Sequence, residues 1–297
     1  MSVNTLDVKL NLRTGPLPSN MEITESTWEI LRLLLEFKLA SVCHISRFLT
    51  GQDQSKYLYR KLRQMWQADL LESFKVFPGS LEGSALYYML SKQGLKLLEE
   101  KISGQQSSIK NYPVAQELMD WGLFKHESQI VEMASLESKN KSADLTLSFS
   151  GESDSRSTDY KAGKTIEALS PDYIVVYKTL QGQQKVYTEF ERTRKSNEAM
   201  LDKIQRYFDF LPPEDYQTAI VRLIFQKSNM EQSFWLNIFK LRASLLRLKI
   251  MTTNLDLITR HEQFLGPIYA SEDTVELIRG SNLKAIIPQR IKLFEPL

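Results

Sequence analysis

The sequence predicts an α/β chain, α+β overall, that folds as two domains. Its 297 residues exceed the usual size of one domain. Helical patterns and one β-hairpin fill the first hundred residues, whereas strands and helices alternate after residue 110. A stretch rich in Gly, Gln and Ser at 103–108 separates the two patterns. The predicted domains therefore span 21–104 and 110–297, after an N-terminal arm at 1–20.

The composition is that of an ordinary globular protein, with 42% hydrophobic and 25% charged residues. No run of about 18 apolar residues predicts a transmembrane helix, and residues 1–18 lack the apolar core of a signal peptide. Cys43 is the only cysteine and there are three histidines, which excludes a disulfide framework and a metal cluster based on Cys or His. These features predict a cytoplasmic protein without a membrane partner. Because the net charge is only +2, nucleic-acid binding would need a local basic surface.

In the first domain, apolar residues at helical spacing predict helices that begin near Thr24 and span about 40–49 and 53–68. Two β-rich runs, 70–77 and 85–90, flank a turn with Pro and Gly and predict a hairpin. Ser91 begins a last helix. Three helices, a hairpin and a trailing helix are the order of a winged helix, a relative of the helix-turn-helix.

The third helix carries a basic face with aromatic residues, which suits phosphates and groove edges in DNA. Two other interpretations stay open: an ordinary solvated helix face and a module that binds proteins only. The candidate DNA-binding residues are Lys56, Tyr57, Tyr59, Arg60, Lys61 and Arg63.

The second domain is predicted to be an α/β domain with a central mixed sheet. Residues 111–136 favour one or two helices, and the polar stretch 151–164 favours a mobile loop. The continuous apolar run at 219–226 is typical of a buried central strand. The other expected elements are strands at 145–150, 170–177, 185–192 and 248–252, and helices at 195–211 and 230–245.

The hairpin formed by 170–177 and 185–192 carries three carboxylates. If its loop is symmetric about Gln181 and Gly182, Asp172 lies opposite Glu191 and diagonal to Glu189. All three then share one face, and a one-residue change in loop length would move them apart.

Carboxylates packed closely repel one another unless they are solvated, protonated or shared with a cation. Hard divalent ions favour such oxygen ligands, so Asp172, Glu189 and Glu191 are a candidate site for Mg²⁺ or Mn²⁺. The alternative is a solvated sheet edge with scattered acids. His126, Glu127 or Glu132 in the preceding helix could add a ligand, and their different faces leave the choice among them open.

The order of elements around Pro171-Asp172, Glu189-Phe190-Glu191 and Lys203 with Tyr207 resembles the PD-(D/E)xK nuclease-like fold, related to restriction endonucleases. With His126 and the winged-helix pattern that ends at Ser91-Lys92-Gln93-Gly94, the chain from about 24 to 225 looks like the replication-relaxation family of plasmids and mobile elements. The resemblance implies a bacterial DNA-binding protein that acts in plasmid replication, DNA relaxation or transfer. It also implies replication or transfer proteins as partners, and leaves the oligomeric state open, a dimer included.

The resemblance also implies catalytic roles for Asp172, Glu189, Glu191 and Lys203. Asp172 and the glutamates would hold the metal, which activates water and polarises the scissile phosphate. Lys203 would orient the attacking water or stabilise the charge that develops on the phosphate. The sequence departs from the nuclease pattern because Glu191 replaces the usual lysine, so Lys203, with Lys195 behind it, is the substitute. A metal-dependent endonuclease, a non-catalytic accessory factor and a ligand-sensing transcription regulator all remain open.

Overall fold

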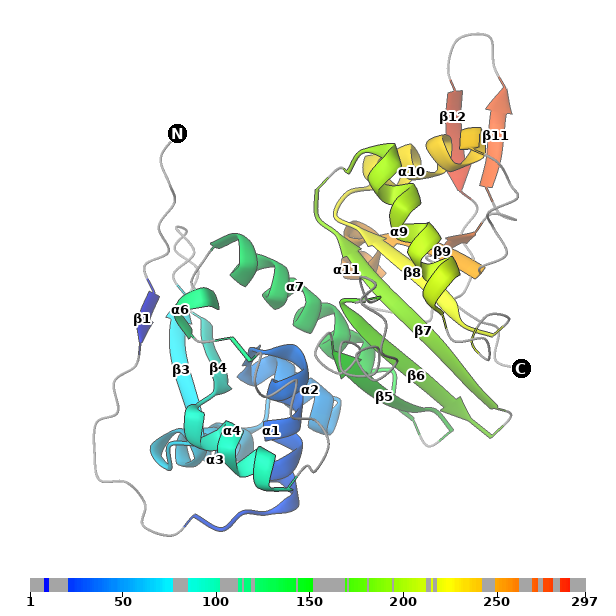
Figure 1. Ribbon diagram of the computed structural model, residues 1–297. Helices are drawn as coiled ribbons and strands as arrows, with labels where there is room; N and C mark the ends of the chain where they lie inside the picture. Colours follow the sequence, from blue (N-terminus) through cyan, green and yellow to red (C-terminus); the bar gives the residue numbers. More distant parts are fainter. Residues whose placement is uncertain are drawn as a thin grey trace. The chain divides into compact units, whose positions relative to one another are not determined.

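The structure of the chain is a computed structural model (Figure 1). It describes residues 8–10, 21–76, 85–101, 112–113, 115–118, 121–142, 144–151, 169, 171–180, 182–193, 195–211, 215, 218–241, 249–261, 269–271, 275–279 and 284–288. Most of the predicted arm, the tip of the first hairpin, the linker at 103–108 and the predicted loop at 151–164, except Gly151, lie outside these residues.

The described residues divide into two compact units, one up to Lys139 and one from Asn140 onward. The first unit contains the helices α1 (Glu25–Phe37), α2 (Val42–Thr50), α3 (Lys56–Gln67), α4 (Lys92–Lys101), α6 (Ala115–Leu118) and α7 (Trp121–Ser138). Its strands are β1 (Val8–Leu10), β2 (Ala40–Ser41), β3 (Leu71–Val76) and β4 (Ala85–Leu90).

The strands of the first unit form one antiparallel sheet in the order β1-β3-β4-β2. The hairpin β3–β4 pairs Leu71 with Leu90, and the short strand β2 adds to β4 by pairing Ala40 with Tyr88. Buried leucines and isoleucines from α1, α2 and α3 make the core of this unit. The predicted three helices, hairpin and trailing helix therefore occur in the expected order.

Helix α7 belongs to the first unit, whereas the sequence placed it in the second domain, after a boundary at 104–110. The physical reason is a set of polar contacts with α1 and α2. Lys38, at the end of α1, lies 2.6 Å from Glu127. His44 of α2 lies 2.6 Å from Glu132. These contacts join distant parts of the sequence, so local patterns did not reveal them.

The second unit is built on a mixed sheet, as the sequence predicted. Its strands are β5 (Thr146–Gly151), β6 (Tyr173–Thr179), β7 (Gly182–Glu191), β8 (Ile220–Phe225), β9 (Lys249–Asn254), β10 (Ala270–Ser271), β11 (Val275–Arg279) and β12 (Lys284–Pro288). Its helices are α9 (Asn197–Phe210), α10 (Ser228–Leu241) and α11 (Leu255–His261). Within the described residues, strands β11 and β12 pair with each other in a separate two-stranded sheet.

The main sheet has the strand order β10-β9-β8-β7-β6-β5. Strands β7, β8 and β9 are parallel, with α9 and α10 as the crossover helices, and β5, β6 and β10 join antiparallel (Figure 1). Strand β8 is buried along its whole length, as expected for a central strand.

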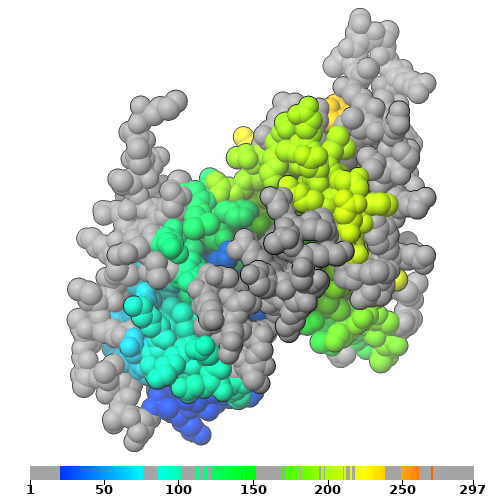
Figure 2. All heavy atoms as spheres, in the orientation of Figure 1, coloured from blue at the N-terminus to red at the C-terminus, as the bar shows by residue number. Residues whose placement is uncertain are grey.

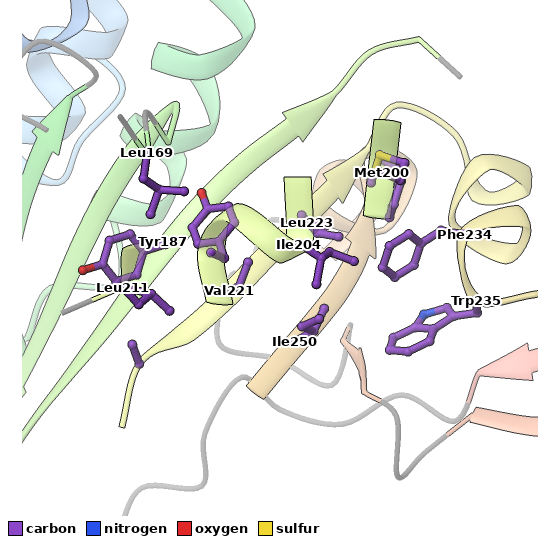
Figure 3. Packing of buried hydrophobic residues seen from close by; sticks show 13 residues of the cluster. Leu169, Tyr187, Met200, Ile204, Leu211, Val221, Leu223, Phe234, Trp235 and Ile250 are labelled. Carbon is purple, nitrogen blue, oxygen red and sulfur yellow. The ribbon is translucent and has the colours of Figure 1, made fainter. Parts of the chain in front are cut away.

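One hydrophobic cluster fixes α9 and α10 to the same face of this sheet (Figure 3). Met200 and Ile204 of α9 and Trp235 of α10 pack on side chains of the parallel strands, among them Val221 and Ile250. Because α9 is held here, the side chains on its sheet-facing stripe have fixed positions next to β7.

The hairpin β6–β7 has a different register from the one expected. Tyr173 pairs with Thr188, and the last pair before the turn is Thr179 with Gly182. This shifts the pairing by two residues along β7, which places Asp172 level with Glu189 rather than with Glu191. A shift of two keeps every side chain on its original face. The acidic residues therefore stay together, although the pairing of the two strands differs from the predicted one.

Among the helices that the structure describes, none is long and apolar enough to cross a membrane.

Candidate functional site

Helix α3 presents one of two candidate sites. Ser55 caps its start by accepting a hydrogen bond from the amide of Leu58. Leu58, Leu62 and Met65, at helical spacing, are buried in the first unit. The opposite side of the helix is therefore directed outward.

The outward side of α3 carries a basic stripe with exposed aromatics. Lys56, Tyr59, Arg60 and Arg63 follow the spacing i, i+3, i+4 and i+7, which places them on one face, and all four are exposed. Tyr59 is 55% exposed and the neighbouring Tyr57 is 62% exposed. We call Lys56, Tyr59, Arg60 and Arg63 the α3 stripe. It unites four of the six predicted DNA-binding residues, with Tyr57 beside them.

Lys61 does not belong to this surface, contrary to the sequence prediction. It is only 6% exposed, and its Nζ donates a 2.9 Å hydrogen bond to Thr24 Oγ1 at the start of α1. Its position, three residues after Leu58 and four before Met65, puts it on the buried face. The aliphatic part of a lysine can lie along apolar surface while the amine reaches a polar partner.

The second candidate site is a cluster of charges between β7 and α9. Glu189 and Glu191 alternate with Phe190 on β7 and therefore point to the same face of the sheet. Lys203 of α9 reaches both: its Nζ lies 2.5 Å from Glu189 Oε2 and 2.6 Å from Glu191 Oε1. The two glutamates are 6% and 2% exposed.

Three further residues complete this charge cluster. Tyr207, one helical turn after Lys203, donates a 2.7 Å hydrogen bond to Glu189 Oε1. Lys195 lies 3.0 Å from Glu191 Oε2. Asp172 Oδ2 accepts a 2.6 Å hydrogen bond from the amide of Phe190, which holds its carboxylate beside β7. We call these six residues the β7–α9 charge cluster: Asp172, Glu189, Glu191, Lys195, Lys203 and Tyr207.

Burial and mutual attraction change the acidities in this cluster. Burial raises the pKa of Glu189, and the nearby charge of Asp172 adds to this, although Lys203 and Tyr207 oppose it. Burial disfavours charge on Lys203, but the attraction of Glu189 and Glu191 is larger and raises its pKa. The Tyr207 pKa lies well above its ordinary value because the hydroxyl is buried next to Glu189. The cluster therefore contains an ammonium that is held charged by two carboxylates.

The carboxylates offer the oxygen ligands that Mg²⁺ and Mn²⁺ prefer, but their oxygens already have partners. Both oxygens of Glu189 and both of Glu191 are bonded to Lys203, Lys195 or Tyr207. Within the described residues, no group of three His, Cys, Asp or Glu side chains is placed to hold a metal ion. The six residues thus form an ion-pair cluster, in which the Lys203 ammonium supplies the positive charge expected from a metal.

The candidate ligands in the preceding helix have partners within the first unit. Glu127 pairs with Lys38, and Glu132 accepts from His44 Nε2 and from Arg47 at 2.8 Å. Burial opposes the ionisation of Glu132, but the bonds from His44 and Arg47 outweigh it and lower its pKa to about 2. These contacts hold α7 against α2. They give no reason to choose His126, Glu127 or Glu132 as a metal ligand.

Sequence reasoning noted Tyr207 and Lys195 but gave Tyr207 no role. Helical spacing carried the missing signal, because Lys203 and Tyr207 stand four residues apart and share a face of α9.

Comparison of the chain with protein-family models, with curated proteins and with solved structures finds no match.

Proposed function

We propose that this chain is a cytoplasmic DNA-binding protein of a bacterial mobile element, whose first unit is a winged helix. The observation that carries this proposal is the α3 stripe, in which three cations and Tyr59 share one exposed helix face. The element order supports it: α3 is followed by the β3–β4 hairpin, and β2 between α1 and α2 pairs with β4. In a winged helix, the third helix is the one that enters the major groove.

The chemistry of the stripe fits duplex DNA. Lys56, Arg60 and Arg63 lie within about 11 Å along the helix, from a rise of 1.5 Å per residue, and can neutralise neighbouring phosphates. Each neutralised phosphate releases counterions, so binding weakens as salt rises with a slope of about −0.9 per contact. The exposed phenol of Tyr59 adds a group that can donate to a phosphate or a base edge.

The salt dependence of binding to a labelled duplex tests this proposal. The variant Lys56→Ala/Arg60→Ala/Arg63→Ala should flatten the slope of log K against log salt by about 3 × 0.9. Its matched control removes the same charge from exposed positions elsewhere in the unit, Lys92→Ala/Lys96→Ala/Lys125→Ala. The atoms of α4, which carries Lys92 and Lys96, lie on the face seen in Figure 2. Equal slopes in the two variants would reject the α3 stripe as the DNA surface.

For the second unit we propose a nuclease-like α/β domain, in the setting of plasmid replication, DNA relaxation or transfer that the family resemblance implies. Replication or transfer proteins are the proposed partners. The geometry supports a non-catalytic accessory role best, because Lys203 and Lys195 neutralise the glutamates without a metal.

A Mg²⁺- or Mn²⁺-dependent endonuclease is the second candidate. The observation that favours it is the meeting of Glu189 and Glu191 with a lysine from the following helix, next to Asp172. A cation would have to take the place of the Lys203 ammonium at Glu189.

Cleavage of supercoiled DNA with either ion separates the two roles. The assay compares wild type with Glu189→Gln and with Glu198→Gln, an exposed carboxylate on α9. Nicking by wild type and Glu198→Gln, but not by Glu189→Gln, would establish the endonuclease. Intact DNA with all three proteins, while duplex binding persists, would support the accessory role.

A further inference from the structure

The turn between β6 and β7 exposes one large apolar side chain. Thr179 and Gly182 form the last pair of the hairpin, and Leu180 in the turn is 94% exposed. Leu180 does not pack in the core, and a tight turn does not require a leucine. Tight turns favour Gly, Asn or Asp, and the unusual backbone is taken up by Gly182, whose φ is +152°.

The hairpin that carries Leu180 extends beyond its neighbour on one side. Strand β8 pairs with β7 only from Val186 onward. Residues 182–185 therefore continue for about 13 Å past the end of β8, at roughly 3.3 Å per residue. The base of this extension is fixed, because Lys185 Nζ lies 2.7 Å from Asp215 Oδ2 and Gln184 bonds to the carbonyl of Thr218. The turn lies at the lower right of Figure 1.

The side chains around the turn are of types that can bind DNA. From Tyr173 to Thr188 the sequence contains no acidic residue. Lys178, Thr179 and Gln183 flank the turn and are exposed, and each carries a hydrogen-bond donor. A single exposed leucine is common on protein surfaces, but here it stands at the tip of a fixed stem whose exposed neighbours, Lys178 and Gln183, can both donate hydrogen bonds. The acidic residue at the base of the stem, Asp215, is paired with Lys185.

We propose that this hairpin is a second DNA contact, which inserts Leu180 between base pairs from the minor groove. Minor-groove proteins use Lys, Arg, Asn and Gln together with an apolar wedge such as Leu, which partly unstacks a base step and kinks the duplex. Here Lys178 and Gln183 bind the backbone or base edges while Leu180 is the wedge. The contact is separate from the β7–α9 charge cluster, since Leu180 and Glu189 lie nine residues apart, about 30 Å along the strand. The inference rests on the proposed function, because it requires that the chain binds duplex DNA.

Energy transfer between dyes at the two ends of a short duplex tests the wedge. Wild type should bend the duplex by an angle within about 20–90°, and Leu180→Met should keep the bend because an apolar tip remains. Leu180→Ser should lose it while still binding through α3. Leu123→Ser is the matched control, since Leu123 of α7 is also exposed, at 37%, and should bend DNA like wild type.

The outcomes separate the wedge from the proposed function. A wild type that binds the duplex without bending it, or a Leu180→Ser variant that bends it like wild type, overturns the wedge and leaves DNA binding by α3 intact. A wild type that does not bind the duplex overturns both.

Discussion

Lys203 Nζ lies 2.5 Å from Glu189 Oε2, and this contact joins α9 to β7 at the centre of the charge cluster. Lys203→Met replaces the lysine by an apolar side chain of similar length and so removes the ammonium that the two buried glutamates share. Breaking a buried pair in this way costs about 3–5 kcal/mol. Because the Lys203 side chain is 21% exposed, we expect the lower end of that range. Chemical denaturation measures the loss.

Lys195→Met is the control for this prediction. Lys195 also pairs with Glu191, but its side chain is 37% exposed, so solvent screens the pair and the loss should stay within about 1 kcal/mol. Equal losses for the two variants would contradict the description of Lys203 as the central charge.

Lys61 should act on stability rather than on DNA. Lys61→Met removes the buried hydrogen bond to Thr24 and should cost about 1.5–3 kcal/mol, as for bonds made by charged groups. The salt slope of DNA binding should not change. Arg60→Ala, at the adjacent exposed position, should instead lower the slope by about 0.9 and leave stability nearly unchanged. A lower salt slope for Lys61→Met would show that Lys61 does contribute to DNA binding.

The charge cluster could be predicted from the sequence because the periods of a strand and of a helix decide which side chains share a face. Glu189 and Glu191 stand two apart on a strand, and Lys203 and Tyr207 stand four apart on a helix, so each pair shares a face whatever the exact register. The register itself was wrong, since the loop could not be located among Leu180, Gln181 and Gly182. The ion pairing with Lys203 also escaped prediction, because it depends on how α9 packs on the sheet.

Acid should weaken the contact between α2 and α7. The pKa of Glu132 in the folded protein is about 2, below its ordinary value of 4.5. Ionised Glu132 therefore stabilises the fold above about pH 4.5, and this contribution is lost as the pH falls toward 2. The side chain is 42% exposed, so we expect an effect of about 1 kcal/mol or less.

Denaturation at about pH 6 and at about pH 3 measures this contribution. Glu132→Gln should lose less stability than wild type between the two conditions, because an amide cannot be protonated there. Glu99→Gln on α4, an exposed carboxylate, should behave like wild type. A Glu132→Gln variant with the full pH dependence of wild type would show that Glu132 is not the group that titrates.

Gly94 of α4 should not tolerate a side chain. A Cβ at this position would overlap the carbonyl oxygen of Leu70, which also accepts a hydrogen bond from the amide of Ser91. Because the obstacle is backbone, relief requires α4 to move, and Gly94→Ala should cost about 1–3 kcal/mol. Lys96→Ala on the exposed side of α4 should stay within about 0.5 kcal/mol. A shift in the denaturation midpoint of equal size in both variants would contradict this.

Local patterns predicted most elements of both units, but not the contacts between distant segments. The run at Ile220–Phe225 shows the difference. Its apolar neighbours identified a buried strand, yet Arg222 within it is fully buried and donates to Thr188 Oγ1 at 2.7 Å and to Tyr173 OH at 3.0 Å. Likewise, the assignment of α7 to the first unit depends on His44 and Arg47, which lie far away in the sequence. Contacts with residues distant in the sequence determine both the burial of Arg222 and the place of α7 in the first unit.

Photo-crosslinking tests most directly whether DNA lies against the exposed face of α3, as we propose. A benzophenone amino acid replaces Tyr59 in one variant and Lys96 of α4 in another; both positions are exposed. With a bound duplex, we expect crosslinks from position 59 and few from position 96. Crosslinks from position 96 but not from position 59, with duplex binding retained, would contradict the account.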